Sequence, residues 1–428
     1  MKPYDEMTSA NSPWLGEIPA HWELSRFRYE AVINGGQVDP REEPWCGMTL
    51  IAPNHIDSNT GRIIGIETAE SQGADSGKYL VEQGQLVYSK IRPVLNKAAI
   101  AETQALCSAD MYAMSFFDRV EPRFALYYFL ARPFHTFVTI ISMRVKMPKV
   151  NREELADAPW LVPPLDEQRA IATYLDRETA RIDTLIEEQQ RLITMLRERR
   201  SVVLTQAATR GLDGAALADS GNVYLGAVPA HWTISRFSRE MDVNGGQVDP
   251  RDDPWADMVL VAPNHIESGT GRIVGRETAR EQGADSGKYL ANAGQILYSK
   301  IRPALNKVAV ATEDCLTSAD MYAMSSRRGD DHRYLMYFML ARPFHAFATL
   351  ASLRVKMPKV NRDELGEAPF LRPPVEEQRK IVAYLDEQTA KIDALIAESE
   401  RFVELSRERR SALITAAVTG QIDVRERV

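Results

Sequence analysis

The sequence predicts an α+β protein built from two copies of a mixed α/β domain, each followed by one long helix. Three observations support this fold class. Nearly every distinctive segment from about residue 14 onward returns 210 positions later, without insertion or deletion. Each copy begins with short β-like runs that Gly, Pro and Asn interrupt. Each copy ends with a stretch, 166–208 and 376–418, that contains neither Gly nor Pro.

The repeat covers a whole domain together with its connecting helix. The clearest identities are 34–41 with 244–251, 72–80 with 282–290, 108–114 with 318–324, and 144–152 with 354–362. A period of 210 residues is far longer than that of a solenoid repeat. A protein with two copies of one domain suits a target that has two copies of one feature.

The first domain is predicted over 1–163 and its copy over 214–373, because a Pro-Pro pair follows the last extended stretch of each. In the first copy, strands are predicted at 48–52, 85–88 and 98–101. A helix is predicted over 123–132, where Pro133 ends it.

Two long helical segments, 164–213 and 374–428, follow the domains. Their apolar residues recur at spacings of three and four, which predicts a coiled coil. These residues are Ile171, Leu175, Ile182, Leu185, Leu192, Leu196 and Val203, and then Ile381, Leu385, Ile392, Leu395, Phe402 and Leu413. A helix of this length extends about 60 Å, and Gly211 and Gly420 supply C-terminal stops.

If the two helices pair antiparallel, the protein has a pseudo-two-fold axis with one domain at each end. Leu185 and Leu395 are then expected in the middle of the paired apolar stripes. The alternative is that each helix is amphipathic and packs only on its own domain. The Arg-Glu-Arg-Arg runs at 197–200 and 407–410 are interpreted as solvated helix surface or as a surface for a partner protein.

The composition is typical of a globular protein, with 44% hydrophobic and 26% charged residues in 428. No apolar run is long enough for a membrane span and residues 1–12 are polar, so we expect a cytoplasmic protein. Cys46, Cys107 and Cys315 have no cysteine at the equivalent position of the other copy. This pattern argues against a disulfide framework or a cysteine zinc site.

The net charge of −7 argues weakly against a nucleic-acid partner, but the distribution of charge favours one. Residues 122–152 contain no acid and several Arg and Lys, and 332–362 repeat this pattern. A second acid-free basic segment, 90–97, returns at 300–307. An acidic chain can therefore carry two local positive faces. The alternative is a solvated surface with chance clustering of charge.

Two motifs, each present twice, carry a family resemblance. The first is Trp14-Leu-Gly-Glu-Ile-Pro-Ala-His-Trp22, repeated at 224–232. The second is Pro163-Pro-Leu-Asp-Glu-Gln-Arg169, which leads into the first long helix and is repeated at 373–379. With these motifs and its domain–helix–domain–helix order, the chain resembles the specificity subunit of type I restriction-modification systems over essentially its whole length.

The resemblance implies two target recognition domains held apart by an antiparallel coiled coil, each reading one half of a bipartite site in double-stranded DNA. It also implies two methyltransferase subunits docked on the coiled coil, which restriction subunits can join. S-adenosylmethionine and ATP are expected only on those partner subunits, so the chain itself is expected to need no cofactor. In most relatives the two recognition domains differ, whereas here they are near copies. We therefore expect inverted-repeat half-sites, with centres about one DNA turn (roughly 34 Å) or somewhat more apart.

Base reading uses Arg or Lys for guanine and Asn or Gln for adenine, and three repeated segments offer these side chains. The predicted DNA-binding residues are Asn34, Gln37, Arg41, Lys90, Arg92, Asn96, Lys97, Arg144, Lys146, Lys149, Asn244, Gln247, Arg251, Lys300, Arg302, Asn306, Lys307, Arg354, Lys356 and Lys359. For any single Lys, phosphate contact is a more common role than base contact. The alternative for each segment is a turn or edge strand with solvent-facing charge.

No catalytic, cofactor or metal site is predicted. The sequence has no P-loop and no Asn/Asp-Pro-Pro-Tyr/Phe loop of an amino-methyltransferase. His21, His55 and His135 recur in the second copy, but without a ligand partner at metal-binding spacing, which favours packing or hydrogen bonding. Asp166 or Glu167, in the Pro-Pro motif, is expected at the N-terminal end of the first long helix, where a carboxylate favours the helix dipole and can cap free N–H groups. Glu376 and Glu377 are expected to do the same for the second. The rival functions are a stand-alone nuclease or methyltransferase with fused recognition domains, and a purely structural scaffold.

Overall fold

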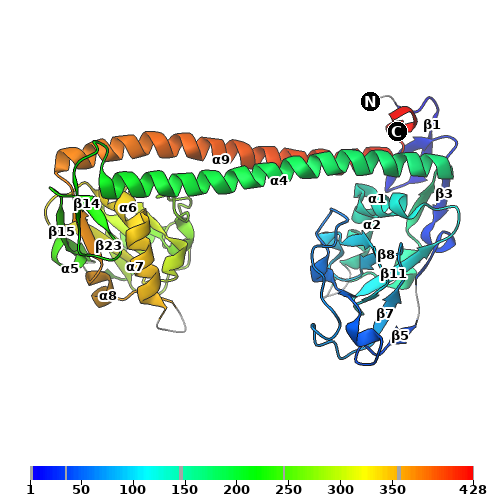
Figure 1. Ribbon diagram of the computed structural model, residues 1–428, viewed down its shortest axis with the longest axis horizontal. Helices are drawn as coiled ribbons and strands as arrows, with labels where there is room; N and C mark the ends of the chain where they lie inside the picture. The colour runs from blue at the N-terminus through cyan, green and yellow to red at the C-terminus, as the bar shows by residue number, and fades with distance from the viewer. Residues whose placement is uncertain (1–2, 34–35, 144–147, 244–245, 354–357, 428) are drawn as a thin grey trace. The chain divides into compact units, whose positions relative to one another are not determined.

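The computed structural model describes residues 3–33, 36–143, 148–243, 246–353 and 358–427 (Figure 1). The chain forms two compact units. Unit 1 comprises Met1–Gln190 and Arg401–Val428, and unit 2 comprises Arg191–Glu400. The boundary cuts through both long helices, so each unit contains one globular domain, part of the first helix and part of the second.

The two long helices are α4 (Leu165–Arg210) and α9 (Val375–Val418), with 46 and 44 residues. At 1.5 Å per residue, they extend about 69 Å and about 66 Å. Gly211 follows α4 directly and Gly420 lies just beyond α9, both with φ of 72°. The predictions of two long helices and of their glycine stops are confirmed.

Two four-stranded sheets form the domain of unit 1. The first has the antiparallel order β4 (Ala31–Ile33), β11 (Met111–Phe116), β8 (Leu86–Ser89) and β9 (Ala98–Ile100). The second has the order β5 (Gln37–Val38), β7 (Lys78–Val81), β10 (Ala105–Cys107) and β6 (Leu50–Ile51), with β10 and β6 parallel. Within unit 1, β5 and β7 lie at the end of the domain remote from α4 (Figure 1). The three strands predicted from the sequence are confirmed as β6, β8 and β9.

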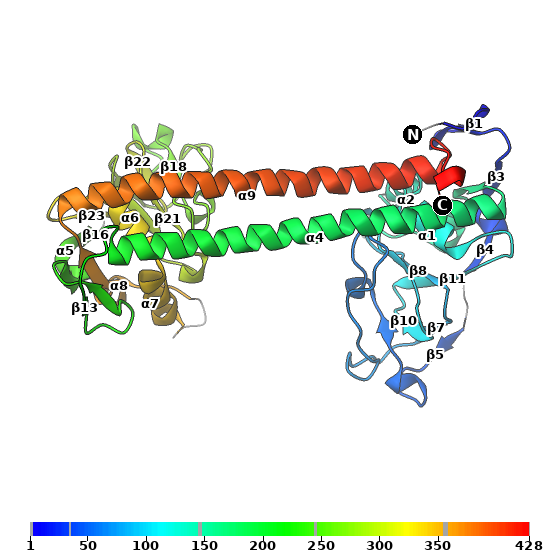
Figure 2. The ribbon, with the colours of Figure 1, turned by 45° about the horizontal axis from the view of Figure 1, so that its top comes forward.

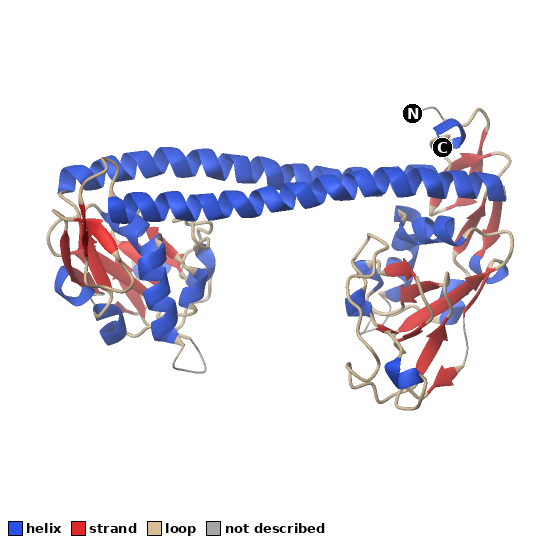
Figure 3. Cartoon of the chain, viewed as in Figure 1, coloured by secondary structure: helices blue, strands red, loops and turns tan. Residues whose placement is uncertain are grey.

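Unit 2 repeats this topology. Its first sheet has the order β16 (Met241–Val243), β23 (Met321–Ser326), β20 (Ile296–Ser299) and β21 (Val308–Val310). Its second has the order β17 (Gln247–Val248), β19 (Lys288–Ala291), β22 (Cys315–Thr317) and β18 (Leu260–Val261). Helices and strands mix in each domain, which confirms the predicted α+β class (Figure 3).

Two short helices, α1 (Pro122–Leu130) and α2 (Arg132–Ser142), lie between α4 and the sheets of unit 1 (Figure 1). Their counterparts are α6 (His332–Leu340) and α7 (Arg342–Ser352). The helix predicted over 123–132 corresponds to α1, which ends before Pro133. The helix α2 was not predicted; Pro133 lies in its first turn, where the missing N–H group costs no hydrogen bond.

No single helix among the described residues is long and apolar enough to cross a membrane; α1 and α2 meet that test only as a pair, bent by 61°.

A ribbon of β3 (Glu23–Arg26) and β12 (Pro159–Val162) connects the domain to α4. Trp160 in β12 is fully buried, with its ring centroid 4.6 Å from that of Tyr128 and 5.7 Å from that of Phe27. This aromatic packing fixes the point where the chain enters α4. The equivalent ribbon of unit 2 pairs β15 (Thr233–Arg236) with β24 (Pro369–Arg372).

Segments of α4 and α9 run side by side in each unit (Figures 1 and 2). In unit 2, Arg200 of α4 donates from Nε to Asp393 Oδ1 at 2.8 Å, and Arg197 donates to Glu400 at 2.8 Å. The later residue of α4 thus pairs with the earlier residue of α9, so the two segments are antiparallel. In unit 1, Asp183 forms the equivalent ion pair with Arg410, at 2.9 Å. The alternative that each helix packs only on its own domain is therefore wrong.

Two expectations for the helices are wrong in part. Leu185 and Leu395 are 44% and 49% exposed, whereas Ile186 of α4 is buried. Other residues of the predicted apolar stripes, such as Ile182 and Ile392, are buried as expected. Three residues of each Arg-Glu-Arg-Arg run are exposed, also as expected, but Arg200 and Arg410 are buried, because both bind the domain of the other sequence copy. Arg200 donates to the carbonyl groups of residues 269 and 270, and Arg410 to those of residues 59 and 60.

Candidate nucleic-acid interface

The fold brings two of the predicted basic segments together. In unit 1, Arg92 N donates to Pro148 O and Val150 N donates to Lys90 O, both at 2.9 Å. Lys149 thereby lies opposite Ile91 in a short antiparallel bridge. In unit 2 the same ladder joins 300–302 to 358–360. Segments some 55 residues apart in sequence therefore form one surface in each domain.

A buried tyrosine organises the cations of this surface. Lys90 Nζ lies 5.4 Å from the centre of the Tyr112 ring, and Arg152 Cζ lies 5.9 Å from it. The Tyr112 hydroxyl donates to Val150 O at 3.2 Å. Burial raises the pKa of Tyr112 and Arg152 opposes that shift, so the hydroxyl remains a donor at neutral pH. In unit 2, Lys300 lies 5.5 Å from the Tyr322 ring.

We call these cations the basic cluster: Lys90, Arg92, Lys149 and Arg152 in unit 1, and Lys300, Arg302, Lys359 and Arg362 in unit 2. Arg92 and Lys149 are exposed, and so are their counterparts. Arg92 also has a φ of 46°, a strained value for a side-chain-bearing residue that is typical of functional positions. Arg152 and Arg362 were absent from the predicted site. Their place in the repeated acid-free stretches was the signal that could have found them.

Four of the predicted DNA-binding residues form hydrogen bonds to backbone carbonyl groups within the fold. Asn96 is 1% exposed and donates from Nδ2 to Leu130 O at 3.3 Å, while Asn306 donates to Leu340 O at 2.9 Å. Lys97 and Lys307 donate to the carbonyl groups of residues 53 and 263, each at 2.6 Å. These contacts support the loop beneath the basic cluster, so the four side chains do not belong to the surface itself.

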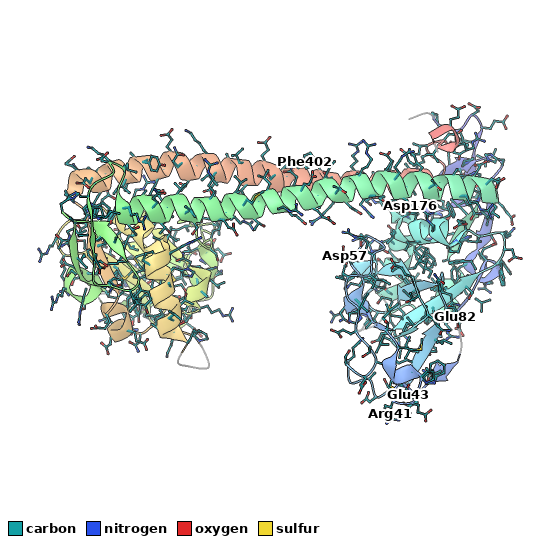
Figure 4. All side chains as sticks on the ribbon, viewed as in Figure 1. Arg41, Glu43, Asp57, Glu82, Asp176 and Phe402 are labelled. Carbon is teal, nitrogen blue, oxygen red and sulfur yellow. The ribbon has the colours of Figure 1, made fainter. Side chains whose placement is uncertain are left out.

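A second predicted segment lies on β5 and the loop that follows it. Arg41 lies at the end of the domain remote from α4 (Figure 4). It forms a two-pronged ion pair with Asp39, with Nε–Oδ1 and Nη2–Oδ2 distances of 2.9 and 2.6 Å. The hydrogen bonds from Arg41 lower the pKa of Asp39 to about 2, and those from Arg251 do the same for Asp249. These two arginines are thus locally neutralised. Gln37 and Gln247 are exposed.

Six predicted residues lie outside the described residues. They are Asn34, Arg144, Lys146, Asn244, Arg354 and Lys356.

The two sequence motifs meet where the domain joins the long helix. Glu167 accepts hydrogen bonds from His21 Nε2 at 2.8 Å and from Trp22 Nε1 at 3.0 Å. Gln168, fully buried, donates to Pro163 O at 2.8 Å. Asp166 and Glu167 lie in the first turn of α4, as expected, and Glu167 also anchors the domain to α4 through its side chain. Glu377 makes the same bonds to His231 and Trp232, at 2.8 and 2.9 Å.

The other histidines that recur in both copies also form hydrogen bonds within the fold. His55 is buried, with Nδ1 at 3.1 Å from Leu50 O, and His135 Nε2 lies 3.1 Å from Val94 O. Among the described residues, no group of three or more His, Cys, Asp or Glu side chains is placed to hold a metal ion.

Comparisons with known proteins agree with this architecture. A family model described as the type I restriction modification DNA specificity domain matches residues 27–194 and 252–401. The specificity subunit of the type I restriction enzyme EcoDI from Escherichia coli is 30% identical over 292 residues, which cover 64% of this chain and 65% of that protein. The chain thus spans less than two-thirds of the length of this relative.

A solved structure shows the same fold. A chain from a study of complex assembly and conformational transition in a type I R-M system matches with a TM-score of 0.69 at 19% identity. The match covers 95% of this chain and 99% of that one. The HsdS subunit of Thermoanaerobacter tengcongensis matches with a TM-score of 0.48 at 17% identity, over 95% of this chain and 98% of that one. Because the family model covers most of the sequence, this chain belongs to the family of type I restriction modification DNA specificity domains.

Proposed function

We propose that this chain is the DNA-recognition subunit of a type I restriction-modification complex and has no catalytic centre of its own. The observation that carries the proposal is the basic cluster, which occurs at equivalent positions in both units of a protein whose net charge is −7. Most acidic residues lie elsewhere, so each domain presents a local positive surface to DNA phosphates. This role requires the compartment that holds DNA, which for such a system is the cytoplasm.

The experiment is a salt titration of DNA binding by the full chain. Each phosphate contact adds about 0.9 to the slope of log affinity against log salt concentration. Lys149→Ala with Lys359→Ala removes one exposed cation from each cluster, so the slope is expected to fall by nearly two units. The matched control is Arg181→Ala with Lys391→Ala, which removes equivalent exposed cations from the two long helices.

An unchanged slope in the cluster variant would contradict the proposal, as would an equal fall in the control. The rival function predicts cleavage or methylation of DNA by the purified chain alone. We expect neither, and either activity would favour the nuclease or methyltransferase alternative.

The two units are proposed to bind the same half-site sequence, because they present the same basic cluster at equivalent positions. We propose that the half-sites form an inverted repeat. This orientation is supported by the antiparallel α4 and α9 segments of each unit. The two helices also exchange roles between the units. In unit 1, α4 supplies the aspartate (Asp183) and α9 the arginine (Arg410), whereas in unit 2, α4 supplies the arginine (Arg200) and α9 the aspartate (Asp393).

The methyltransferase subunits are proposed to dock on the outer face of the helix pairs. Unit 1 exposes Leu185, Phe402 and Leu405 on these helices, and unit 2 exposes the equivalent residues Leu395, Leu192 and Met195. Phe402 lies on α9 (Figure 4). Exposed apolar side chains that recur at the same positions mark a protein-binding surface. One such surface in each unit supports two methyltransferase subunits for each chain.

A pair of neighbouring substitutions tests this docking surface. Leu185→Asp adds charge to an exposed side chain, so we expect a folded protein that loses methyltransferase at unit 1. Ile186→Asp buries a charge between α4 and the residues it packs on, so we expect unit 1 itself to be destabilised by several kcal/mol. Normal methyltransferase association in folded Leu185→Asp would contradict the docking proposal.

A further inference from the structure

The duplicated sequence shows which exposed residues the two domains keep. Many exposed positions differ between the copies, as in Tyr29 and Arg239 or Ile66 and Arg276. Other exposed segments are identical, including 36–41, 73–76 and 148–152. Two domains that evolve on one chain have no packing reason to keep exposed side chains. A shared ligand supplies such a reason.

Backbone pairing connects the identical segments to the basic cluster. On β5, Gln37 lies opposite Tyr79 of β7, and Tyr79 lies opposite Cys107 of β10, which is fully buried. The turn after β10 ends at Asp110, whose carbonyl accepts from Lys90 N at 3.0 Å. Lys90 in turn pairs with the segment that contains Lys149. We call the exposed residues of the identical segments, together with the basic cluster, the shared surface; unit 2 repeats it.

Within the shared surface, the amide of Gln37 is available to a ligand. The side chain is exposed and makes no hydrogen bond to any residue that the structure describes. By contrast, Arg41 is held by Asp39, and Lys78 donates to Ser76 O at 2.5 Å.

A glycine lies beneath the Gln37 amide. A Cβ atom at Gly77 would lie 3.0 Å from Gln37 Oε1, closer than ordinary van der Waals contact. The corresponding distance between Gly287 and Gln247 Oε1 is 3.4 Å. A Cβ atom would therefore crowd the amide in unit 1, whereas in unit 2 the same contact would be an ordinary van der Waals one; both copies retain the glycine.

We propose that Gln37 and Gln247 each read one adenine in their half-site, while the basic cluster holds the neighbouring phosphates. This inference rests on the proposed DNA-recognition function. A glutamine amide presents a donor and an acceptor in one plane, which match N7 and the N6 amino group of adenine in the major groove. A contact of this kind discriminates against a wrong base by about 5- to 150-fold.

The test selects bound duplexes from a pool of randomised DNA, with the full chain in its complex with methyltransferase subunits. Gln37→Ala changes one copy only, so the second half-site serves as an internal control. We expect one adenine position in one half-site to lose its preference by about 5- to 150-fold, with the salt slope unchanged. Gln37→Glu is expected to shift that position toward cytosine, whose N4 amino group donates to a carboxylate.

Two further variants make the result specific. Gly77→Ala places a Cβ against the Gln37 amide and should weaken the same adenine preference without altering the glutamine. Gln83→Ala changes an exposed glutamine outside the shared surface to the residue already present at 293, and should leave the motif unchanged. An unaltered motif in folded Gln37→Ala would overturn the inference that Gln37 reads adenine, but not the proposed function. A wild-type complex that selects no sequence would instead overturn the proposed function.

Discussion

The buried ion pair between Arg200 and Asp393 tests how the long helices hold the domains. The two side chains are 8% and 19% exposed. Asp393→Ala leaves a buried guanidinium without its counter-charge, a loss that costs about 3 to 5 kcal/mol. Arg200 keeps its bonds to the carbonyl groups of Gly269 and Thr270, at 2.7 and 3.1 Å, which places the expected cost near the lower figure.

For a folding unit of this size, about 3 kcal/mol corresponds to a fall of roughly 6 to 12 °C in unfolding temperature. Two units need not unfold together, so the assay is hydrogen exchange on peptides from each unit, combined with calorimetry. Asp393→Ala should accelerate exchange at 267–272 in unit 2 and spare unit 1. The matched variant Asp183→Ala, which unpairs Arg410, should do the reverse. A change below about 2 °C in the unit 2 transition with Asp393→Ala would refute the reasoning.

Two further predictions concern single units. Gly420→Ala should destabilise unit 1 by at least about 1 to 2 kcal/mol, since φ is 72° and the new Cβ would lie 2.2 Å from Pro19 Cδ. Calorimetry should show a smaller change for Gly226→Ala, where φ is 61° and no atom lies within 4 Å, because only the backbone cost of about 1 to 2 kcal/mol applies there. In unit 2, burial works against the charge of Asp330, but hydrogen bonds from Arg372 and two other side chains outweigh it and lower its pKa below 3.8. Because the folded pKa is the lower one, the stabilisation is present above about pH 3.8 and is lost as pH falls through the folded value. In Asp330→Asn, the stability of unit 2 should therefore fall less steeply as the pH is lowered. The same pH dependence of stability in the variant and the wild type would contradict this role of Asp330.

The sequence was sufficient to predict the domain repeat, the long helices and the α+β class. Each depends on local signals: a fixed period, the absence of Gly and Pro, and short apolar runs between turn residues. The start of α2 was missed because Pro133 is equally compatible with the end of one helix and the first turn of the next.

Burial and long-range partners could not be predicted. Leu185 and Ile186 are both apolar, so spacing alone did not tell which of them faces inward. Arg200 resembles a solvated helix residue until the fold brings residues 269 and 270 to it. Similarly, Asn96 has the side chain of a base-reading residue, yet its partner Leu130 lies on a helix that only the tertiary structure places beneath it.

The most direct test of the central claim is to map the methylated DNA motif in cells that express this chain with its proposed methyltransferase partner. Near-identical domains with the same exposed basic cluster predict two identical half-sites, inverted around a spacer without sequence preference. Two unrelated half-sites would contradict the claim that both domains read the same sequence. A direct repeat would contradict the proposed inverted orientation of the two half-sites.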